Sequence, residues 1–190
     1  MKASLKRETK ETCIEASLDI YGKGLFEAST GIELLDDVLR AMAAGGGFDL
    51  SIKASGDYQT GDHHTVEDVG ISLGSALKKA LGEKKGIERF ADARIPMDEA
   101  LATAAVDISG RSCLAFDAKL GSQGIGGFNP QNTRHFFESL VSNAGINAHL
   151  AVTGENDHHK IEALFKAFAV ALKRAVKVSG TGVPSTKGVL

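Results

Sequence analysis

Two segments of the chain share the pattern His-His-x-x-Glu, which is suited to binding metal ions. They contain His63, His64 and Glu67, and His158, His159 and Glu162. On a helix, side chains three or four positions apart share one face, whereas adjacent side chains diverge by about 100°. Each glutamate can therefore pair with its histidines, while the two imidazoles of a pair point in different directions. Because two such imidazoles cannot easily chelate one ion, the pattern predicts two metal centres that draw on both segments or on neighbouring chains.

The chain contains an internal duplication that includes both of these segments. The segment GDHHTVEDVGISLGSALKKAL at 61–81 aligns with NDHHKIEALFKAFAVALKRAV at 156–176, and LDIYGK at 18–23 aligns with VDISGR at 106–111. The two offsets, 95 and 88 residues, place seven extra residues within the second half, and we expect them in the Gly-rich stretch 121–130. A histidine pair that occurs in both copies favours metal binding over a surface accident, because the accident would have to survive in each copy. The ligand types suit several divalent metals, and the spacing does not choose among them.

Hydrophobic periodicity predicts the elements that position these side chains. Alternation typical of half-buried strands occurs at 12–20 and 48–54, and again near 102–109, 112–118 and 146–152. Helical patterns occur at 33–45, from each histidine pair onward (61–81 and 157–178) and near 130–144. Each half is therefore expected to run strand, strand, helix, strand, helix. This predicts an α+β fold built by tandem duplication of a β-β-α-β-α unit, with the first half at 1–92 and the second at 93–190.

Capping signals mark where the helices are expected to begin. Thr30 followed by Glu33 is a possible capping box for the first helix. Asp62 and Asn156 directly precede the two histidine pairs and are the expected N-caps of those helices. The histidines would then lie in the first helical turn.

Composition limits the classes of protein to which the chain can belong. Its 190 residues are 43% hydrophobic and 24% charged, enough for one domain or two small ones. The formal charge of −2 gives no support to a nucleic-acid partner, because phosphate neutralisation needs clustered Lys and Arg. No apolar stretch approaches the roughly 20 residues of a membrane helix, and the N-terminal segment lacks the apolar core of a signal peptide. We therefore expect a cytoplasmic protein without a membrane partner, in which Cys13 and Cys113 are reduced.

Several segments, taken together, resemble the imidazoleglycerol-phosphate dehydratase family in order and spacing. They are TKET (9–12), HHTVEDVGI (63–71), PMDE (96–99), SGR (109–111), GENDHHKIEALFK (154–166) and PSTKG (184–188). The similarity runs essentially from end to end, and the two His-His-x-x-Glu segments carry most of its specificity. The resemblance implies a duplicated fold like the second domain of ribosomal protein S5, two Mn²⁺ ions per active site, and trimers that assemble through the metal sites into a 24-subunit shell.

The resemblance also assigns roles to individual residues. The matched metal ligands are His63, His64, Glu67, His135, His158, His159 and Glu162. The matched phosphate-binding positions are Arg89, Arg111, Lys166, Ser185 and Lys187, and Glu11 matches a glutamate beside the substrate. One departure concerns the segment Leu35 to Leu39, where the family usually reads L-D-H-M-L. Asp37 stands at the position of a metal-binding histidine there, and it could still ligate through oxygen.

The implied reaction is the metal-dependent dehydration of imidazole glycerol phosphate to imidazole acetol phosphate in histidine biosynthesis. It removes a hydroxyl group next to the imidazole ring and a proton from the carbon beyond it. That proton is not acidic by itself, so a Lewis acid on a ring nitrogen would assist its removal. Glu11, Glu67 and Glu162 are the candidates for proton transfer, since a carboxylate beside a cation can act as a base near neutrality.

Other functions stay open at this stage. Because Asp37 and Gly45 stand where the family usually has histidines, the chain could be a catalytically weakened paralogue or a metal-binding oligomeric shell protein. A carboxylate-histidine protein that stores metal or activates oxygen would need long helices throughout with Glu-x-x-His motifs, whereas here the strands alternate with the helices and histidine precedes glutamate. An RNA-binding module is suggested only by the S5-like fold and is opposed by the acidic balance.

Overall fold

The computed structural model describes residues 1–56, 61–188 and 190, and its two halves repeat one arrangement. The first half contains β1 (Lys2–Glu8), β2 (Thr12–Asp19), β3 (Phe26–Ser29), α1 (Glu33–Gly46), β4 (Asp49–Gly56) and α2 (His63–Leu81). The second contains β5 (Phe90–Met97), β6 (Ala100–Asp107), β7 (Cys113–Ala118), α3 (Asn132–Ala144), β8 (Asn147–Thr153) and α4 (Asp157–Ala175). The strand orders β1-β2-β4-β3 and β5-β6-β8-β7 are equivalent. The predicted α+β class and its duplication are confirmed.

Each half carries the predicted β-β-α-β-α unit, preceded by one further strand. β1 pairs antiparallel with β2, and β5 pairs antiparallel with β6, so both additional strands are sheet edges. β1 has only three inward-facing side chains, which are half-buried, and this leaves a weak periodic signal. The boundary placed between residues 92 and 93 falls within β5, and the two halves are joined by the segment 82–89 that precedes this strand.

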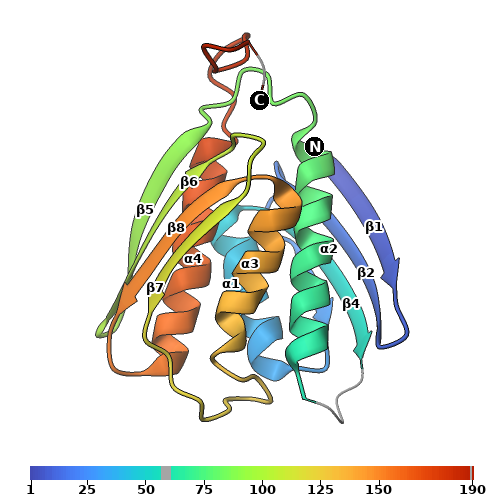
Figure 1. The fold of residues 1–190 in the computed structure, drawn as a ribbon, viewed down its shortest axis with the longest axis vertical. Coiled ribbons are helices and arrows are strands. Elements are labelled where there is room, and N and C mark those ends of the chain that lie inside the picture. Colours follow the sequence, from blue (N-terminus) through green and yellow to red (C-terminus); the bar gives the residue numbers. More distant parts are fainter. Residues whose placement is uncertain (57–60, 189) are drawn as a thin grey trace.

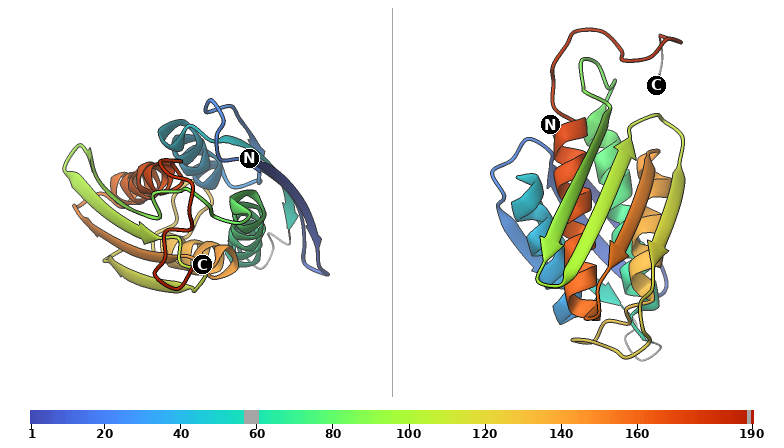
Figure 2. Two further views of the ribbon diagram at one scale, coloured as in Figure 1. Left: turned by 90° about the horizontal axis from the view of Figure 1, so that it is seen from above. Right: turned by 90° about the vertical axis from the view of Figure 1, so that its left-hand side faces the viewer.

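The two sheets enclose a central layer of four helices (Figure 1; Figure 2, left). Within this layer α2 packs on α3 and α1 packs on α4, so each helix pair contains one helix from each half. Gly70 and Gly74 allow the α2–α3 contact, because a Cβ atom at Gly74 would lie 2.3 Å from the Leu140 carbonyl oxygen and one at Gly70 would lie 2.7 Å from that of Phe136. The halves therefore share one hydrophobic core and are not separate domains.

All four helices begin at the same end of the molecule, the lower end in Figure 1. The starts of α2 and α4 agree with the predicted positions of the two histidine pairs. Asn156 caps α4 by accepting a hydrogen bond from the His159 backbone N–H at 3.2 Å. Asp62 is the N-cap residue of α2, as predicted, but its side chain makes no cap hydrogen bond, and its carboxylate accepts instead from the Asn129 N–H at 2.8 Å.

The capping box predicted at Thr30 and Glu33 is wrong. Ile32 is the N-cap residue of α1 and makes no side-chain cap hydrogen bond. The Thr30 hydroxyl donates instead to the Asp36 carboxylate at 2.7 Å, one turn further along the chain. The carboxylate partner of Thr30 is therefore Asp36, three positions after the predicted Glu33. A local motif does not determine which carboxylate the hydroxyl meets.

The predicted insertion is confirmed as the long loop 119–131 between β7 and α3, where the first half has only residues 30–32 between β3 and α1. This loop connects the starts of three helices. Its Gly126 carbonyl accepts from the Leu34 N–H of α1, its Asn129 N–H donates to Asp62 before α2, and its Gly121 N–H donates to Asp157 of α4. The extra residues therefore lie across the end of the molecule that carries the histidines.

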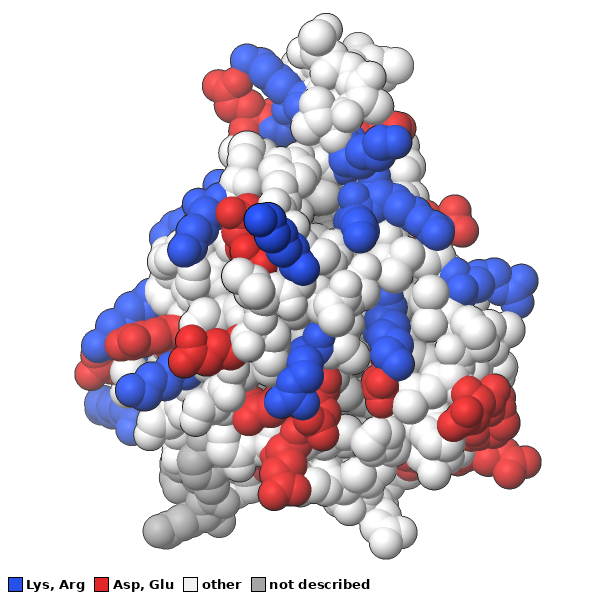
Figure 3. Space-filling model, turned by 180° about the vertical axis from the view of Figure 1, so that it is seen from behind, with Lys and Arg blue, Asp and Glu red and all other residues white. Residues whose placement is uncertain are grey.

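The charged side chains on the surface are of mixed sign. On the face shown in Figure 3, Lys and Arg are interspersed with Asp and Glu, and most of the visible acidic side chains lie in the lower half, toward the end where the helices begin. Carboxylates near helix N-termini are favoured by the helix dipole. None of the described helices combines the length and hydrophobicity required for a membrane span.

Candidate active site

The first cluster of predicted ligands lies in the first turn of α2 and on the neighbouring α3. The His63 Nδ1 atom lies 3.2 Å from Asn132 Oδ1, and its Nε2 atom lies 3.8 Å from Glu67 Oε2. The His135 ring, from α3, meets the His63 ring edge-on with the ring centroids 4.7 Å apart. The close α2–α3 packing therefore gathers two imidazoles and a carboxylate from both halves of the chain. Asn132 orients the first of these imidazoles, so that Nε2 faces Glu67.

Glu11 reaches the same cluster from the turn between β1 and β2. Its Oε2 atom lies 3.6 Å from His64 Nδ1, close enough for an ion pair but too long for a hydrogen bond. The Nδ1 atom is buried and has no hydrogen-bond partner in the described chain. A buried polar atom without a partner is costly. This nitrogen is therefore free for a ligand, a water molecule or a small movement of Glu11.

The second cluster lies in the first turns of α4. His158 Nε2 lies 3.3 Å from Glu162 Oε2, and the other oxygen of this carboxylate, Oε1, lies 2.6 Å from Lys166 Nζ. Lys166, predicted to bind phosphate, is thus paired with a predicted metal ligand. This lysine can neutralise Glu162 until a stronger cation binds the carboxylate.

His159 is held by Glu99, a residue of the turn between β5 and β6. The His159 Nδ1 atom lies 2.7 Å from Glu99 Oε2, while Nε2 lies 3.6 Å from the exposed Asp98 carboxylate. Glu99 also accepts hydrogen bonds from the backbone N–H groups of Asn156 and Glu155. The Asn156 N–H, followed by the His159 ring, lowers the pKa of Glu99 to about 2. The hydrogen bond to Glu99 in turn raises the pKa of His159.

The adjacent imidazoles of each pair point apart. The His63 and His64 rings have centroids 5.9 Å apart and planes at 70°, and the His158 and His159 rings have centroids 6.2 Å apart and planes at 86°. Each pair therefore offers nitrogen atoms in two directions, as expected for residues that are neighbours on a helix.

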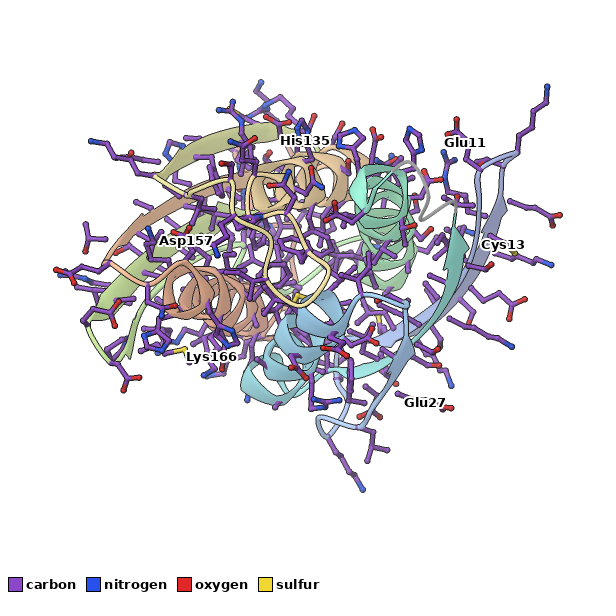
Figure 4. All side chains as sticks on the ribbon, turned by 90° about the horizontal axis from the view of Figure 1, so that it is seen from below. Glu11, Cys13, Glu27, His135, Asp157 and Lys166 are labelled. Atoms are coloured by element: carbon purple, nitrogen blue, oxygen red, sulfur yellow. The ribbon has the colours of Figure 1, made fainter. Side chains whose placement is uncertain are left out.

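One chain does not bring the two clusters together. Seen from the end where the helices begin, Glu11 and His135 lie along one side of the molecule and Lys166 lies on the opposite side of the helical layer (Figure 4). Within residues 1–56, 61–188 and 190, no group of three or more His, Cys, Asp and Glu side chains is arranged to hold a metal ion. Each cluster is therefore an incomplete set of ligands.

Asp37 lies on α1 and pairs with a neighbouring arginine. Its Oδ1 atom lies 2.6 Å from Arg40 Nη1, and the Arg40 guanidinium lies over the Phe26 ring. Both members of the pair are exposed, at 58% and 60% of their side-chain surfaces, so the pair is weak and can open. Metal binding by Asp37 stays a prediction, because none of its contacts in the described chain involves a histidine pair.

Four of the predicted phosphate-binding residues lie at the other end of the molecule. Arg89, Arg111, Ser185 and Lys187 belong to the segments that follow α2, β6 and α4. The C-terminal segment continues beyond the end of α4 (Figure 1), and α4 has 19 residues. At 1.5 Å per residue the helix is about 28 Å long, so these residues lie roughly that far from the histidines of their own chain.

Arg89 is already engaged in this conformation. Its guanidinium donates to the Asp107 carboxylate at 2.8 Å and to the Pro184 carbonyl at 2.8 Å, and it lies over the Phe90 ring at 4.4 Å. Arg89 therefore fixes the start of the C-terminal segment that carries Ser185 and Lys187. To contact phosphate directly, the guanidinium would have to break its hydrogen bond to the Asp107 carboxylate or to the Pro184 carbonyl.

Two residues that orient the histidines, Asn132 and Glu99, are not predicted by the sequence patterns. Asn132 gave no signal, because its partner is 69 residues away. Glu99 could have been found, because it stands 88 residues after Glu11, which is the offset of the upstream repeat.

A buried ionic network attaches the turn bearing Glu11 to α2. The Asp68 carboxylate accepts from Arg7 Nε at 2.9 Å and from the Thr12 hydroxyl. Arg7 lies at the end of β1 and Thr12 at the start of β2, so the network holds both ends of the turn. The Asp68 side chain is only 11% exposed, and removing it would leave Arg7 without its carboxylate and the Thr12 hydroxyl with only the Thr9 hydroxyl, at 3.2 Å, among the described residues.

Asp68→Ala is expected to lower the free energy of unfolding by about 2–3 kcal/mol, because it breaks a buried charged network whose arginine remains partly solvated. Denaturant unfolding at matched protein concentration measures this change. Asp117→Ala, at an exposed position of β7, serves as the control and should change stability by less than about 0.5 kcal/mol. Equal stability of the two variants would contradict the proposed role of the network.

Comparisons with known proteins identify the family of the chain. The sequence pattern of "Imidazoleglycerol-phosphate dehydratase" matches residues 30–172. Proteins of that name from Methanococcoides burtonii and Methanosarcina barkeri are 54% and 53% identical to this chain, over 99% and 98% of its length and 98% and 97% of theirs. The chain belongs to the imidazoleglycerol-phosphate dehydratase family. The resemblance found in the sequence is confirmed.

Solved structures of imidazoleglycerol-phosphate dehydratases share the fold. The Staphylococcus aureus structure superimposes with a TM-score of 0.84 at 36% identity and covers 95% of this chain and 100% of its own. The Pyrococcus furiosus structure, a complex with (S)-C348, has a TM-score of 0.83 at 36% identity and covers 98% of this chain and 100% of its own. The duplicated architecture is thus that of the dehydratase family.

The donor atoms fit the divalent metal that the resemblance to imidazoleglycerol-phosphate dehydratases implies. Each cluster combines imidazole nitrogens with a glutamate, and His64 Nδ1 is a buried nitrogen without a hydrogen-bond partner among the described residues. Asn132 and Glu99 act on the Nδ1 atoms of His63 and His159, which leaves Nε2 available on each ring.

Proposed function

We propose that this chain catalyses the metal-dependent dehydration of imidazole glycerol phosphate to imidazole acetol phosphate, a step in histidine biosynthesis. Full-length similarity to proteins named for this activity is the observation that carries the proposal. The two histidine clusters support it, because they offer nitrogen and oxygen ligands in equivalent places of both halves. We place the reaction in the cytoplasm, which is compatible with free Cys13 and Cys113 on different sheets.

We further propose that the active site forms between subunits and holds two Mn²⁺ ions, in a 24-subunit assembly built from trimers. The support is geometric, because the two clusters lie on opposite sides of one chain (Figure 4). The C-terminal phosphate-binding residues lie about 28 Å from both clusters of their own chain, as the length of α4 requires. Contacts between copies can bring one chain's α2 cluster, another's α4 cluster and a C-terminal segment around a single substrate.

The bound cations would supply Lewis-acid stabilisation of negative charge on the imidazole ring. In this arrangement Glu67 and Glu162 serve as ligands, because each lies one helical turn after its histidines. Glu11 is better placed to move the proton. It lies on a turn instead of a helix, its side chain is 58% exposed, and its carboxylate is not held by a hydrogen bond from the described chain. The residue can therefore approach the substrate carbon and then release the proton.

Lys187→Ala is expected to raise KM for the substrate by about 10- to 100-fold, because an ammonium–phosphate contact is worth about 1.5–3 kcal/mol. The value of kcat should change much less, because the phosphate takes no part in the bonds that form or break. Steady-state kinetics together with inhibition by inorganic phosphate measure both effects. Lys6→Ala, on the outer face of the first sheet, is the matched control. An unchanged KM and unchanged phosphate inhibition in Lys187→Ala would remove this residue from the site.

The direct test of the function is the formation of imidazole acetol phosphate from its substrate by the purified chain. Activity should be lost after treatment with a chelator and return on addition of Mn²⁺. The alternative of a weakened paralogue or a metal-binding shell predicts bound metal without turnover, and in that case Asp37→His should restore activity. The present comparisons favour the active enzyme, since the matched relatives carry the enzyme's name over their full length.

A further inference from the structure

The duplication places a carboxylate beside the second histidine of each pair. Glu11 lies in the turn between β1 and β2, and Glu99 lies 88 residues later in the equivalent turn between β5 and β6. Glu11 faces Nδ1 of His64, and Glu99 faces Nδ1 of His159. The two glutamates are therefore structural counterparts, and their histidines are counterparts at an offset of 95 residues.

The two counterparts differ in how firmly they are held. Glu99 accepts three hydrogen bonds, from the N–H groups of Asn156 at 2.8 Å and Glu155 at 3.1 Å and from His159 Nδ1 at 2.7 Å. Glu11 instead lies 3.6 Å from His64 and accepts no hydrogen bond from the described residues. Glu99 is therefore immobilised against the start of α4, whereas Glu11 can move.

A fixed carboxylate determines which nitrogen of its histidine can bind a cation. An ionised carboxylate only accepts hydrogen bonds, so His159 must donate from Nδ1 to Glu99. In the neutral ring the lone pair then lies on Nε2, and carboxylate–histidine pairs of this kind orient metal-binding imidazoles. The only charged neighbour of Nε2 within the described chain is the exposed Asp98 carboxylate, at 3.6 Å. Nothing there encloses the nitrogen.

We propose that Glu99 is a positioning residue, which holds His159 with Nε2 directed toward the cation, while its counterpart Glu11 is left free for proton transfer. One ancestral contact has thus acquired two roles after duplication. The inference rests on the proposed function for the identity of the ligand, a divalent cation.

The test measures Mn²⁺ binding to the assembled protein by electron paramagnetic resonance of the free ion. Glu99→Ala is expected to weaken one class of Mn²⁺ site by about 10- to 100-fold, and Glu99→Gln should weaken it less, because the amide oxygen still accepts a hydrogen bond. Excess Mn²⁺ should restore turnover to both variants. It should not restore turnover to Glu11→Gln, whose defect is not in binding the metal.

Two controls separate this role from a structural one. Asn156→Ala removes the cap at the His159 N–H, so it should lower the melting temperature without weakening Mn²⁺ binding. Glu155→Gln alters an exposed carboxylate of the same loop and should change neither quantity. The proposal is overturned if both Glu99 variants bind Mn²⁺ as tightly as the wild type, or if Asn156→Ala weakens binding as much as Glu99→Ala. A wild-type protein that binds no Mn²⁺ would instead refute the proposed function.

Discussion

His158→Ala is expected to lower kcat by about 10³-fold or more and to reduce the bound metal from two ions per chain toward one. Losing an imidazole ligand would weaken the binding of the proposed cation, whose Lewis acidity would lower the activation barrier by several kcal/mol, and each 1.36 kcal/mol is a factor of ten. Glu162, 3.3 Å from His158, would keep its ion pair with Lys166 and would therefore be a poorer ligand for the more weakly bound ion. Elemental analysis after gel filtration and a turnover assay measure the two effects.

The effect of His158→Ala should be confined to the metal site. Its side chain is 40% exposed, so the free energy of unfolding should change little. His149→Ala is the matched control, because His149 is an exposed histidine on β8 that belongs to neither cluster. A His158→Ala protein that lost metal but kept full activity would exclude a catalytic role for that ion. Equal metal loss in His149→Ala would show that the measured metal is bound elsewhere.

Glu11→Gln is expected to lower kcat by about 10²- to 10⁴-fold, with KM and bound metal nearly unchanged. The amide has the shape of the carboxylate but cannot take up a proton, and this range is typical for loss of a general acid–base group. Because Glu11 is held by no hydrogen bond from the described chain, its substitution should leave the fold intact. The comparison separates proton transfer from ligand loss, since His158→Ala alters metal content and Glu11→Gln does not.

The control for this prediction is Glu8→Gln, three residues earlier in β1. The Glu8 side chain is 69% exposed and contacts only Lys6, at 3.6 Å, within the described chain. Its replacement should leave kcat and KM unchanged. If Glu11→Gln retained full kcat, proton transfer would have to pass to Glu67 or Glu162, and the distinct roles of Glu11 and Glu99 would have no basis.

Local sequence patterns predicted most elements for a simple reason. Strands β2 and β4 alternate with period two, and α2 and α4 show the helical period, because each of these elements buries one face. Such a pattern can be seen within each segment alone. β1 was missed because Lys, Arg and Glu dominate an edge strand that is only half covered. Asp62 is the predicted N-cap residue, but its carboxylate makes no capping hydrogen bond because it meets Asn129, a residue 67 positions away.

The duplication predicted equivalent positions but not equivalent chemistry. The network of Arg7, Thr12 and Asp68 in the first half has Ile95, Ala100 and Ala163 at the corresponding repeat positions. In the second half, Glu99 instead attaches the turn between β5 and β6 to the start of α4. Each half thus stabilises its turn with different residues, a divergence that alignment can reveal but whose contacts only coordinates show.

The amino-acid order alone predicted the duplication, the candidate ligand types and the family, because these depend on residue identity and spacing along one chain. Only the folded molecule decided that helices of different halves pair and that the α2 and α4 clusters lie on opposite sides. It also decided that Glu99 is held by hydrogen bonds, whereas Glu11 accepts none from the described residues. These features depend on side-chain directions and on contacts between residues far apart in the chain. Such contacts are selected by packing of the whole core, so no local pattern contains them.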